Sequence, residues 1–341
     1  MKSHIGSSAL NLKQATSDGN VSNALRESVS RDVKKLSVLK PYKTYFAVAF
    51  DWAVIFVAIL TSMYFSSVGV YIFSAFIIGA RQHSLLIIMH EAAHKRISNN
   101  LFLNDFIGDF FAAIPVFMGV AGYRAHHMQH HFNLNTEKDP DWARKSQLND
   151  WQFPMSQKEF AVMITKYLFL GGSIKEWGNL VLIFSGLSSI TEERTIKSLK
   201  PLFIRIVFYG GITGLVCHFG HWSYLLLYWL APYLFVMLLF QRIRSIAEHF
   251  GTSRDHELSD SRNVITSGFE AFFLGPHNVN YHLDHHIFPS VPFYNLPSLH
   301  QKLKQHDEYR THAHLNTSYI WPTENSLLKD IISEKPSGGI K

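Results

Sequence analysis

The chain has 341 residues, of which 47% are hydrophobic and 17% charged, and its formal net charge is +6. The single cysteine, Cys217, excludes a disulfide framework, a cysteine-type zinc site and a protein-bound iron–sulfur cluster. The apolar residues gather in long runs, which indicates an integral membrane protein rather than one or two soluble domains. Basic residues flank these runs, as on the cytoplasmic side of membrane segments, so the charge does not indicate a nucleic-acid partner.

The first third of the chain predicts a leader and a membrane hairpin. Residues 1–40 are polar, and we expect a flexible cytoplasmic leader ending in a basic helix around Arg31 to Lys43. Apolar runs at 45–64 and 70–89 each have the length of a bilayer span, and the loop between them is uncharged. Lys and Arg residues before and after the pair place both ends in the cytoplasm. Asp51 lies within two turns of the interface, so we expect its carboxylate to reach the headgroups.

Two middle segments are too polar or too short to predict further spans. The stretch 101–118 contains Asn104, Asp105, Asp109 and Pro115, which favours a re-entrant or interfacial helical pair. The runs at 160–172 and 177–190 favour helices that lie in the membrane interface. The charged segment 133–157 between them predicts a cytoplasmic loop.

A second hairpin is predicted by the apolar runs 201–219 and 222–240, which are joined by Gly220 and His221 and bordered by basic residues. His218 and His221 then lie on the far side of the bilayer from the other histidine clusters, so we do not expect them to bind metal. His249 lies a few turns beyond the last run, on the same side as those clusters.

Three histidine-rich segments predict a metal centre. They are H-E-A-A-H at 90–94, H-M-Q-H-H at 127–131 and H-L-D-H-H at 282–286. In a helix, positions i, i+3 and i+4 share one face, so each segment presents several imidazoles together. A zinc ion in a protein takes four ligands, or three and water, so these histidines predict two metal ions. The candidate ligands are His90, His94, His127, His130, His131, His282, His285 and His286, with His249 as a ninth.

Several neighbouring residues could support the ligands. Glu248 could accept the other N–H of an imidazole, or it could pair with Arg244 one turn away. Glu91, Asp284 and His277 are further candidates for such supporting contacts. The remaining histidines near the C-terminus lack this spacing, so we expect them on the surface; they are His300, His306, His312 and His314.

Two other kinds of protein contain related patterns. H-E-A-A-H matches the HExxH motif of zinc proteases, in which two histidines bind zinc and the glutamate is the base. That reading leaves the second and third segments unexplained. A metal transporter would place histidines and carboxylates along the spans at mid-membrane, whereas these segments lie at span ends or in polar loops.

The three segments, in this order and separated by apolar hairpins, resemble the membrane fatty acid desaturase and hydroxylase superfamily. The run N-Y-H-L-D-H-H-I-F-P-S-V-P-F-Y-N-L-P is similar to its bacterial acyl-lipid and rhizobitoxine-type branches. The resemblance covers about 45–307. It implies an all-α integral membrane protein with four transmembrane helices in two hairpins and a cytoplasmic helical cap that holds two metals. The desaturase domain would cover 41–310, followed by a cytoplasmic tail at 311–341.

The resemblance also implies the chemistry. The nine histidines would bind two non-haem irons, with O2 as co-substrate, and the enzyme would introduce a cis double bond into an acyl lipid. Hydroxylation by the same fold stays open. Two electrons per turnover would come from a ferredoxin, a rubredoxin or cytochrome b5 with its reductase, because the chain has no cluster of its own and lacks the haem signature H-P-G-G.

A bacterial inner membrane is favoured over the endoplasmic reticulum. Ser245 stands where stearoyl-type enzymes carry an asparagine near one metal, so their finer contacts are not carried over.

Overall fold

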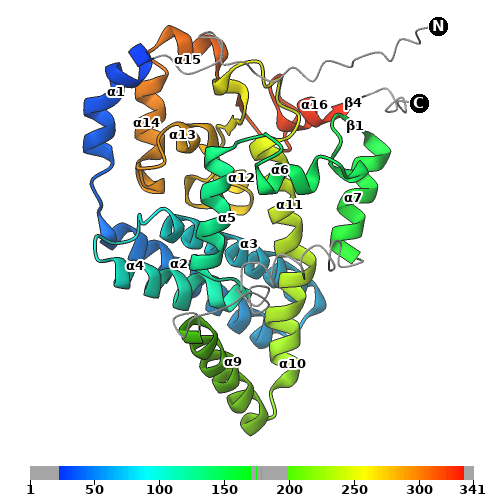
Figure 1. Cartoon of the computed structure of the whole chain (residues 1–341). Coiled ribbons are helices and arrows are strands. Elements are labelled where there is room, and N and C mark those ends of the chain that lie inside the picture. The colour runs from blue at the N-terminus through cyan, green and yellow to red at the C-terminus, as the bar shows by residue number, and fades with distance from the viewer. Residues whose placement is uncertain (1–22, 170–173, 175–177, 179–198, 334–341) are drawn as a thin grey trace, which may run out of the picture.

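The protein is predominantly helical, as predicted. The computed structural model describes residues 23–169, 174, 178 and 199–333 (Figure 1). In these residues the strands form two short parallel pairs, which the sequence did not predict. β1 (Met155–Ser156) pairs with β4 (Ile332–Ser333), and β2 (Asn263–Val264) pairs with β3 (Leu315–Asn316). Both pairs join segments far apart in the sequence.

Three helices of the described residues are long and apolar enough to cross a membrane. They are α2 (Pro41–Phe65), α3 (Val68–Ala93) and the continuous helix Trp222–His249. The predicted spans 45–64, 70–89 and 222–240 lie inside them. The fourth predicted span, 201–219, lies in α9 (Leu199–Phe219), whose apolar part, Phe203–Phe219, is shorter than those three helices.

The helix Trp222–His249 consists of α10 (Trp222–Leu225), two π-helical segments, η6 (Leu226–Leu230) and η7 (Tyr233–Met237), and α11 (Leu238–His249). Pro232 lies between the π-helical segments, where its missing N–H and its ring disturb regular α-helical bonding. This helix packs closely on α3 at Gly79, where an added Cβ would lie 2.5 Å from the Cβ of Val236. Every residue of α3 from 78 to 93 is buried, so the end of α3 that carries the first histidine segment lies inside the protein.

The segment 101–118, predicted as a helical pair, forms one continuous helix, Leu101–Val116. A second helix follows it after a sharp turn. α4 (Leu101–Gly108), the π-helical η1 (Asp109–Ala113) and the 3-10 helix η2 (Ile114–Val116) continue into each other. The chain turns at Phe117, where φ is 62°, and α5 (Val120–Phe132) leaves at 92°. Asn104 does not break the helix because its buried amide bonds the backbone of Ala92 and Ile97.

The other described elements form a helical layer at one end of the molecule, away from the lower ends of α9 and α10 (Figure 1). They are α1 (Asn23–Leu36), α6 (Pro140–Lys145), η3 (Asn149–Trp151), α7 (Gln157–Phe169), η8 (Glu257–Ser259), α12 (Gly268–Phe273), η9 (Pro276–Asn278), α13 (His282–Ile287), η10 (Phe293–Asn295), α14 (Leu296–Leu303), α15 (Asp307–His312) and α16 (Leu327–Ile331). Leu25 and Val29 of α1 share a hydrophobic core with Leu283, Leu299 and Leu303.

Parts of the predicted organisation differ from the structure. The basic helix expected around 31–43 is divided, because α1 ends at Leu36 and α2 begins at Pro41. The first of the two expected interfacial runs is α7. The second, 177–190, lies outside the described residues apart from Gly178, as do most of the leader, 1–22, and the end of the tail, 334–341.

Two predictions about single residues were wrong. Asp51 is fully buried and does not reach the headgroups, because Arg81 and His277 bind its two oxygen atoms. His300 is not on the surface. It is buried in contact with the carboxylate of Asp284, which gives its imidazole a partner inside the protein.

Candidate metal centre

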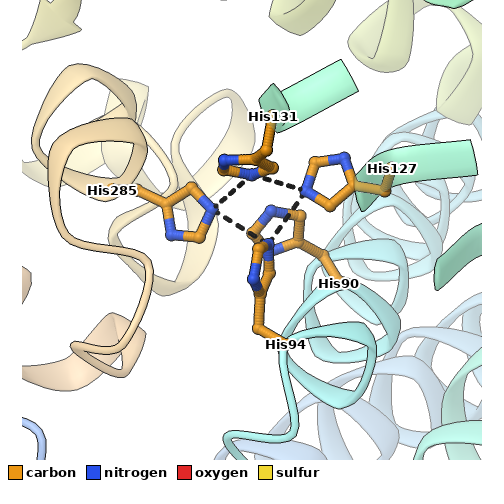
Figure 2. A group of neighbouring side chains, drawn as sticks. All are labelled: His90, His94, His127, His131 and His285. Atoms are coloured by element: carbon orange, nitrogen blue, oxygen red, sulfur yellow. Dashed lines mark hydrogen bonds between the residues drawn. The ribbon is translucent and has the colours of Figure 1, made fainter. Parts of the chain in front are cut away.

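Five imidazoles converge at the buried end of α3. They come from all three predicted segments: His90 and His94 from α3 and its C-cap, His127 and His131 from α5, and His285 from α13 (Figure 2). One ring nitrogen atom from each of them lies within 4.8 Å of the corresponding atoms of the other four. We call these residues the five-histidine group.

Four further imidazoles form a second group beside the first. They are His130 from α5, His249 from the end of α11, and His282 and His286 from α13. The Nε2 atom of His249 lies 3.1 Å from that of His130 and 2.9 Å from that of His282. We call this set the four-histidine group. His249, the predicted ninth residue, belongs to it.

The two groups share helices in a regular way. In α5, His127 and His131 join the five-histidine group while His130 joins the other; in α13, His282 and His286 join the four-histidine group while His285 crosses over. At 100° per residue, positions i and i+4 differ by 40° and i+3 lies 60° to the other side of i. The i and i+4 imidazoles therefore share a site, and the i+3 imidazole reaches the neighbouring one. His131 and His286 stack at the boundary, with ring centroids 4.2 Å apart.

The geometry of each group fits a metal ion. Nε2 of His94 lies 3.0 Å from Nε2 of His127 and 3.2 Å from that of His285. Two nitrogen atoms at right angles around one ion, each about 2.1 Å from it, are about 3.0 Å apart. Both ring nitrogens of His90 are buried and have no hydrogen-bond partner among the described residues. A set of all-nitrogen donors suits iron, zinc, copper or nickel.

His94 and the three histidines of α13 are held neutral, which is the protonation state that binds metal. Burial, together with the charges of Arg96 and Arg124, lowers the pKa of His94 to about 3. Burial also lowers the pKa of each histidine in α13 well below its usual value, and the neighbouring imidazoles add to the effect.

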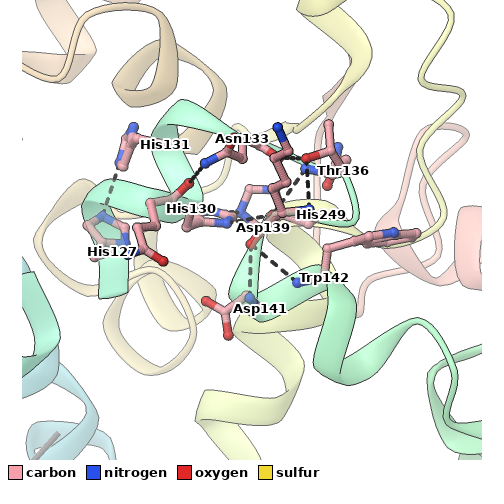
Figure 3. Close-up of polar contacts among 12 residues, drawn as sticks. His127, His130, His131, Asn133, Thr136, Asp139, Asp141, Trp142 and His249 are labelled. Atoms are coloured by element: carbon pink, nitrogen blue, oxygen red, sulfur yellow. Dashed lines mark hydrogen bonds and ion pairs between the residues drawn. The ribbon is translucent and has the colours of Figure 1, made fainter. Parts of the chain in front are cut away.

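Two carboxylates orient imidazoles of the four-histidine group. Oδ2 of Asp139 lies 2.9 Å from Nδ1 of His130, while its Oδ1 accepts from the backbone of Asp141 and Trp142 at the start of α6 (Figure 3). Oε1 of Glu248 lies 3.2 Å from Nδ1 of His282. Such contacts fix the tautomer and direct Nε2 at the metal.

Both roles considered for Glu248 are present, since the same oxygen also accepts from Nε of Arg244 at 2.6 Å. Asp139 was not predicted as a supporting residue, because the sequence Asp139-Pro140-Asp141 reads as a turn. One feature of the sequence could have indicated it: Asp139 lies eight residues after the second histidine segment, at a position that caps a helix.

The other three supporting candidates contact different partners. Oε2 of Glu91 accepts from the backbone N–H of Phe293 at 3.1 Å, and its Oε1 lies 3.6 Å from Nδ1 of His90. Asp284 binds His300 and Tyr309. His277 binds Asp51. The side chains of Asp284 and His277 therefore hold the segments around α13, and none of these hydrogen bonds among the described residues goes to a histidine of either group.

Comparisons with known proteins agree with this arrangement. A family model described as fatty acid desaturase matches residues 66–318. The chain is 30% identical over 290 residues to a dihydrorhizobitoxine desaturase from Bradyrhizobium elkanii, covering 82% of this chain and 80% of that protein. It is 26% identical over 226 residues to an sn-1 acyl-lipid omega-3 desaturase (ferredoxin) from Nostoc, covering 62% and 61%. It is 24% identical over 238 residues to an sn-1 oleoyl-lipid 12-desaturase from Arthrospira platensis, covering 64% of each.

The chain belongs to the fatty acid desaturase family. It is accordingly an oxidoreductase and a membrane protein, with two histidine groups compatible with a metal site. In this desaturase, the HExxH match at 90–94 does not form an isolated pair, since His90 and His94 lie among three further imidazoles. The Glu91 carboxylate, the base in a zinc protease, is bound to the backbone of Phe293.

A cavity borders the four-histidine group of the desaturase. Its wall includes His130, His249 and His282 of that group and His127 of the other. Apolar side chains from several elements complete one part of the wall: Leu86, Met89, Met118, Trp151, Tyr167 and Leu238. Ser245 also lines it and accepts from Nζ of Lys145 at 2.8 Å. The position that departs from the stearoyl-type pattern thus faces the cavity.

Proposed function

We propose that this desaturase introduces a cis double bond into the acyl chain of a membrane lipid, using O2 and two irons. The observation that carries this proposal is the convergence of nine imidazoles in two adjacent groups beside a partly apolar cavity. Two irons would supply, when bound, the activation of O2 and the removal of two hydrogens from neighbouring carbons. One group alone would hold one ion; the pair favours a two-metal centre.

The residues of the chain would hold the metals and position the substrate. His90, His94, His127, His131 and His285 would bind one iron, and His130, His249, His282 and His286 the other. The group with fewer ligands borders the cavity, so we expect the reacting methylene to lie there. Leu86, Met89 and Leu238 supply apolar contacts along the cavity.

The electrons would come from a separate protein. Two electrons per turnover are needed to reduce O2 fully alongside the two hydrogens of the substrate, and Cys217 is the only cysteine. Relatives named as ferredoxin-dependent acyl-lipid desaturases support a ferredoxin as the donor. We place the metal centre and both chain ends on the cytoplasmic side of a bacterial inner membrane, because basic residues flank the hairpins.

A smaller, more polar substrate is the second candidate. The cavity wall also contains the charged side chains of Asp141, Arg144 and Lys145 from α6, and of Arg242 from α11. A relative that is 30% identical is named a dihydrorhizobitoxine desaturase. Hydroxylation, which would give an alcohol in place of an alkene, is the alternative type of reaction.

The test is gas chromatography with mass spectrometry of total fatty acids from cells that express the desaturase with a ferredoxin and its reductase. A His285→Ala variant is the negative control, and His221→Ala is the matched control, since His221 lies in the loop between α9 and α10. A new unsaturated acid with wild type and His221→Ala only supports the proposal. Two irons per chain without such an acid would direct the search to hydroxylated or small-molecule products, and one zinc per chain would contradict it.

A further inference from the structure

A buried ionic cluster joins the first hairpin to the third histidine segment. Oδ1 of Asp51 in α2 accepts from Nη1 of Arg81 in α3 at 3.1 Å. Its Oδ2 lies 2.7 Å from Nε2 of His277, which belongs to the loop before α13. Arg81 also donates to the carbonyl of Phe272 and lies over the Phe272 ring, 3.9 Å from its centroid. Asp51 is fully buried and Arg81 is 2% exposed.

The loop that receives this contact has an unfavourable backbone conformation. His277 and Asn278 have φ of 52° and 55°, in the left-handed region that residues other than glycine seldom adopt. Such residues persist only where their surroundings hold them. Here Nδ2 of Asn278 donates to the carbonyl of Phe293, and Nδ2 of Asn280 donates to that of Val264. The side chain of His277 connects this loop to Asp51 in α2.

The cluster also lies on the helix that carries the first histidine segment. Arg81 precedes His90 by nine residues in α3, or roughly 13 Å along the helix axis. His277 precedes His282, the first residue of α13, by five residues. The cluster therefore fixes the start of α13 relative to α3 close to Phe293, whose ring centroid lies 5.2 Å from that of His277 and whose backbone N–H is bound by Glu91.

We infer that Asp51, Arg81 and His277 form an anchor that positions the third histidine segment, and that the four-histidine group depends on it most. This inference rests on the proposed binding of two metals. The third segment supplies two of four imidazoles to that group, His282 and His286, but only His285 of five to the other. Displacement of α13 therefore removes a larger share of the ligands from the four-histidine group. His277 acts as a positioning residue through α13 and does not bind metal itself.

The test is a Co²⁺ titration of the metal-depleted, full-length protein in detergent, followed by its visible absorption. Wild type should bind two ions. In His277→Ala, which keeps the pair of Asp51 and Arg81, one ion should bind 10- to 100-fold more weakly, the range typical for loss of a contact that orients ligands. The other ion should bind as in wild type. His277→Gln, whose amide can still donate to Asp51, should recover most of the lost affinity.

The matched control is His314→Ala, because His314 contacts Asp330 at 2.8 Å in a similar histidine–aspartate pair away from α13. It should bind both ions like wild type. Two unchanged ions in His277→Ala would overturn the inference, and so would equal weakening of both ions without recovery in His277→Gln. Failure of the proposed function has a different signature: wild type would then fail to bind two ions, or would bind them and make no product.

Discussion

The five-histidine and four-histidine groups differ in how their ligands are held. In the five-histidine group, His90 is packed among other imidazoles, with ring centroids 4.5 Å from His285 and 4.6 Å from His127. In the four-histidine group, His130 and His282 each have a carboxylate beside Nδ1. The first group is thus held mainly by packing of its imidazoles against one another, with one long contact of 3.5 Å between the Tyr123 hydroxyl and Nδ1 of His127. The second is held by shorter hydrogen bonds to carboxylates.

The difference indicates that the two groups have different roles toward the metal and the substrate. A site with five imidazoles leaves little room for another ligand, whereas a site with four, next to a cavity, can accept one. Carboxylates that orient imidazoles also raise their basicity, which compensates for the smaller number of ligands. We expect the five-histidine group to retain its metal more firmly and the four-histidine group to face the substrate.

The largest effect is expected from removing ligands. The double variant His285→Ala, His286→Ala removes one imidazole from each group, so product should fall by more than about 100-fold, beyond the loss typical for supporting contacts. Iron analysis of the purified protein should show loss at both sites. His314→Ala provides the control and should keep activity and iron. Normal product in the double variant would exclude both groups as the metal centre.

A smaller and more selective effect is expected from Asp139→Asn. Asparagine still caps α6, because it is as good an N-cap as aspartate, but it removes the charge beside His130. The affinity of one of two metal ions should fall by about 10- to 100-fold, as measured by metal titration. Asp307→Asn, at an exposed aspartate, should leave both affinities unchanged. Weakening of the more tightly bound ion instead would reverse the assigned roles of the groups.

Glu91→Gln should have a moderate effect that separates a desaturase from a zinc protease. The glutamine oxygen can still accept from Phe293, so the link between α3 and the loop after α13 persists. Product formation should fall by less than about tenfold, because the bond is kept and only the difference between a carboxylate and an amide acceptor, about 1 kcal/mol, is lost. A general base would be lost entirely in this variant. Complete loss of activity with both metals retained would therefore contradict the structural role of Glu91.

The smallest effect is expected from Ser245→Ala at the cavity wall. The change removes the hydrogen bond from the charged amine of Lys145, a type worth about 1.5–3 kcal/mol to stability, but this bond joins two residues of the protein and is not made to the substrate. Substrate KM should change by up to a few fold, while both metals stay bound. Ser253→Ala, at an exposed loop serine, serves as the control. A lost metal in Ser245→Ala would place Ser245 in the support of the four-histidine group rather than in the cavity.

Local sequence spacing predicted the site better than the contacts that support it. The i, i+3 and i+4 patterns identified the histidines that the structure brings together, and the position of His249 after a span added the ninth. Their division into five and four did not follow from the spacing alone, because it depends on how α5 and α13 face each other. Asp51 and His300 were misread because their partners, among them His277 for Asp51 and Asp284 for His300, could not be inferred from local spacing. Asp139 was missed because its turn signature concealed its contact with His130.

The position of α1 has a consequence for synthesis of the chain. Leu25 and Val29 lie against Leu299 and Leu303, so one of the first described helices completes its core with one of the last. Until α14 leaves the ribosome, the apolar side of α1 has no partner, and α13 has no finished support. The histidines of the two groups are likewise spread over all three thirds of the chain. Such long-range closure is slow and exposes apolar surface to aggregation, so a nascent chain that stops before residue 296 should be a substrate for quality control even with its hairpins inserted.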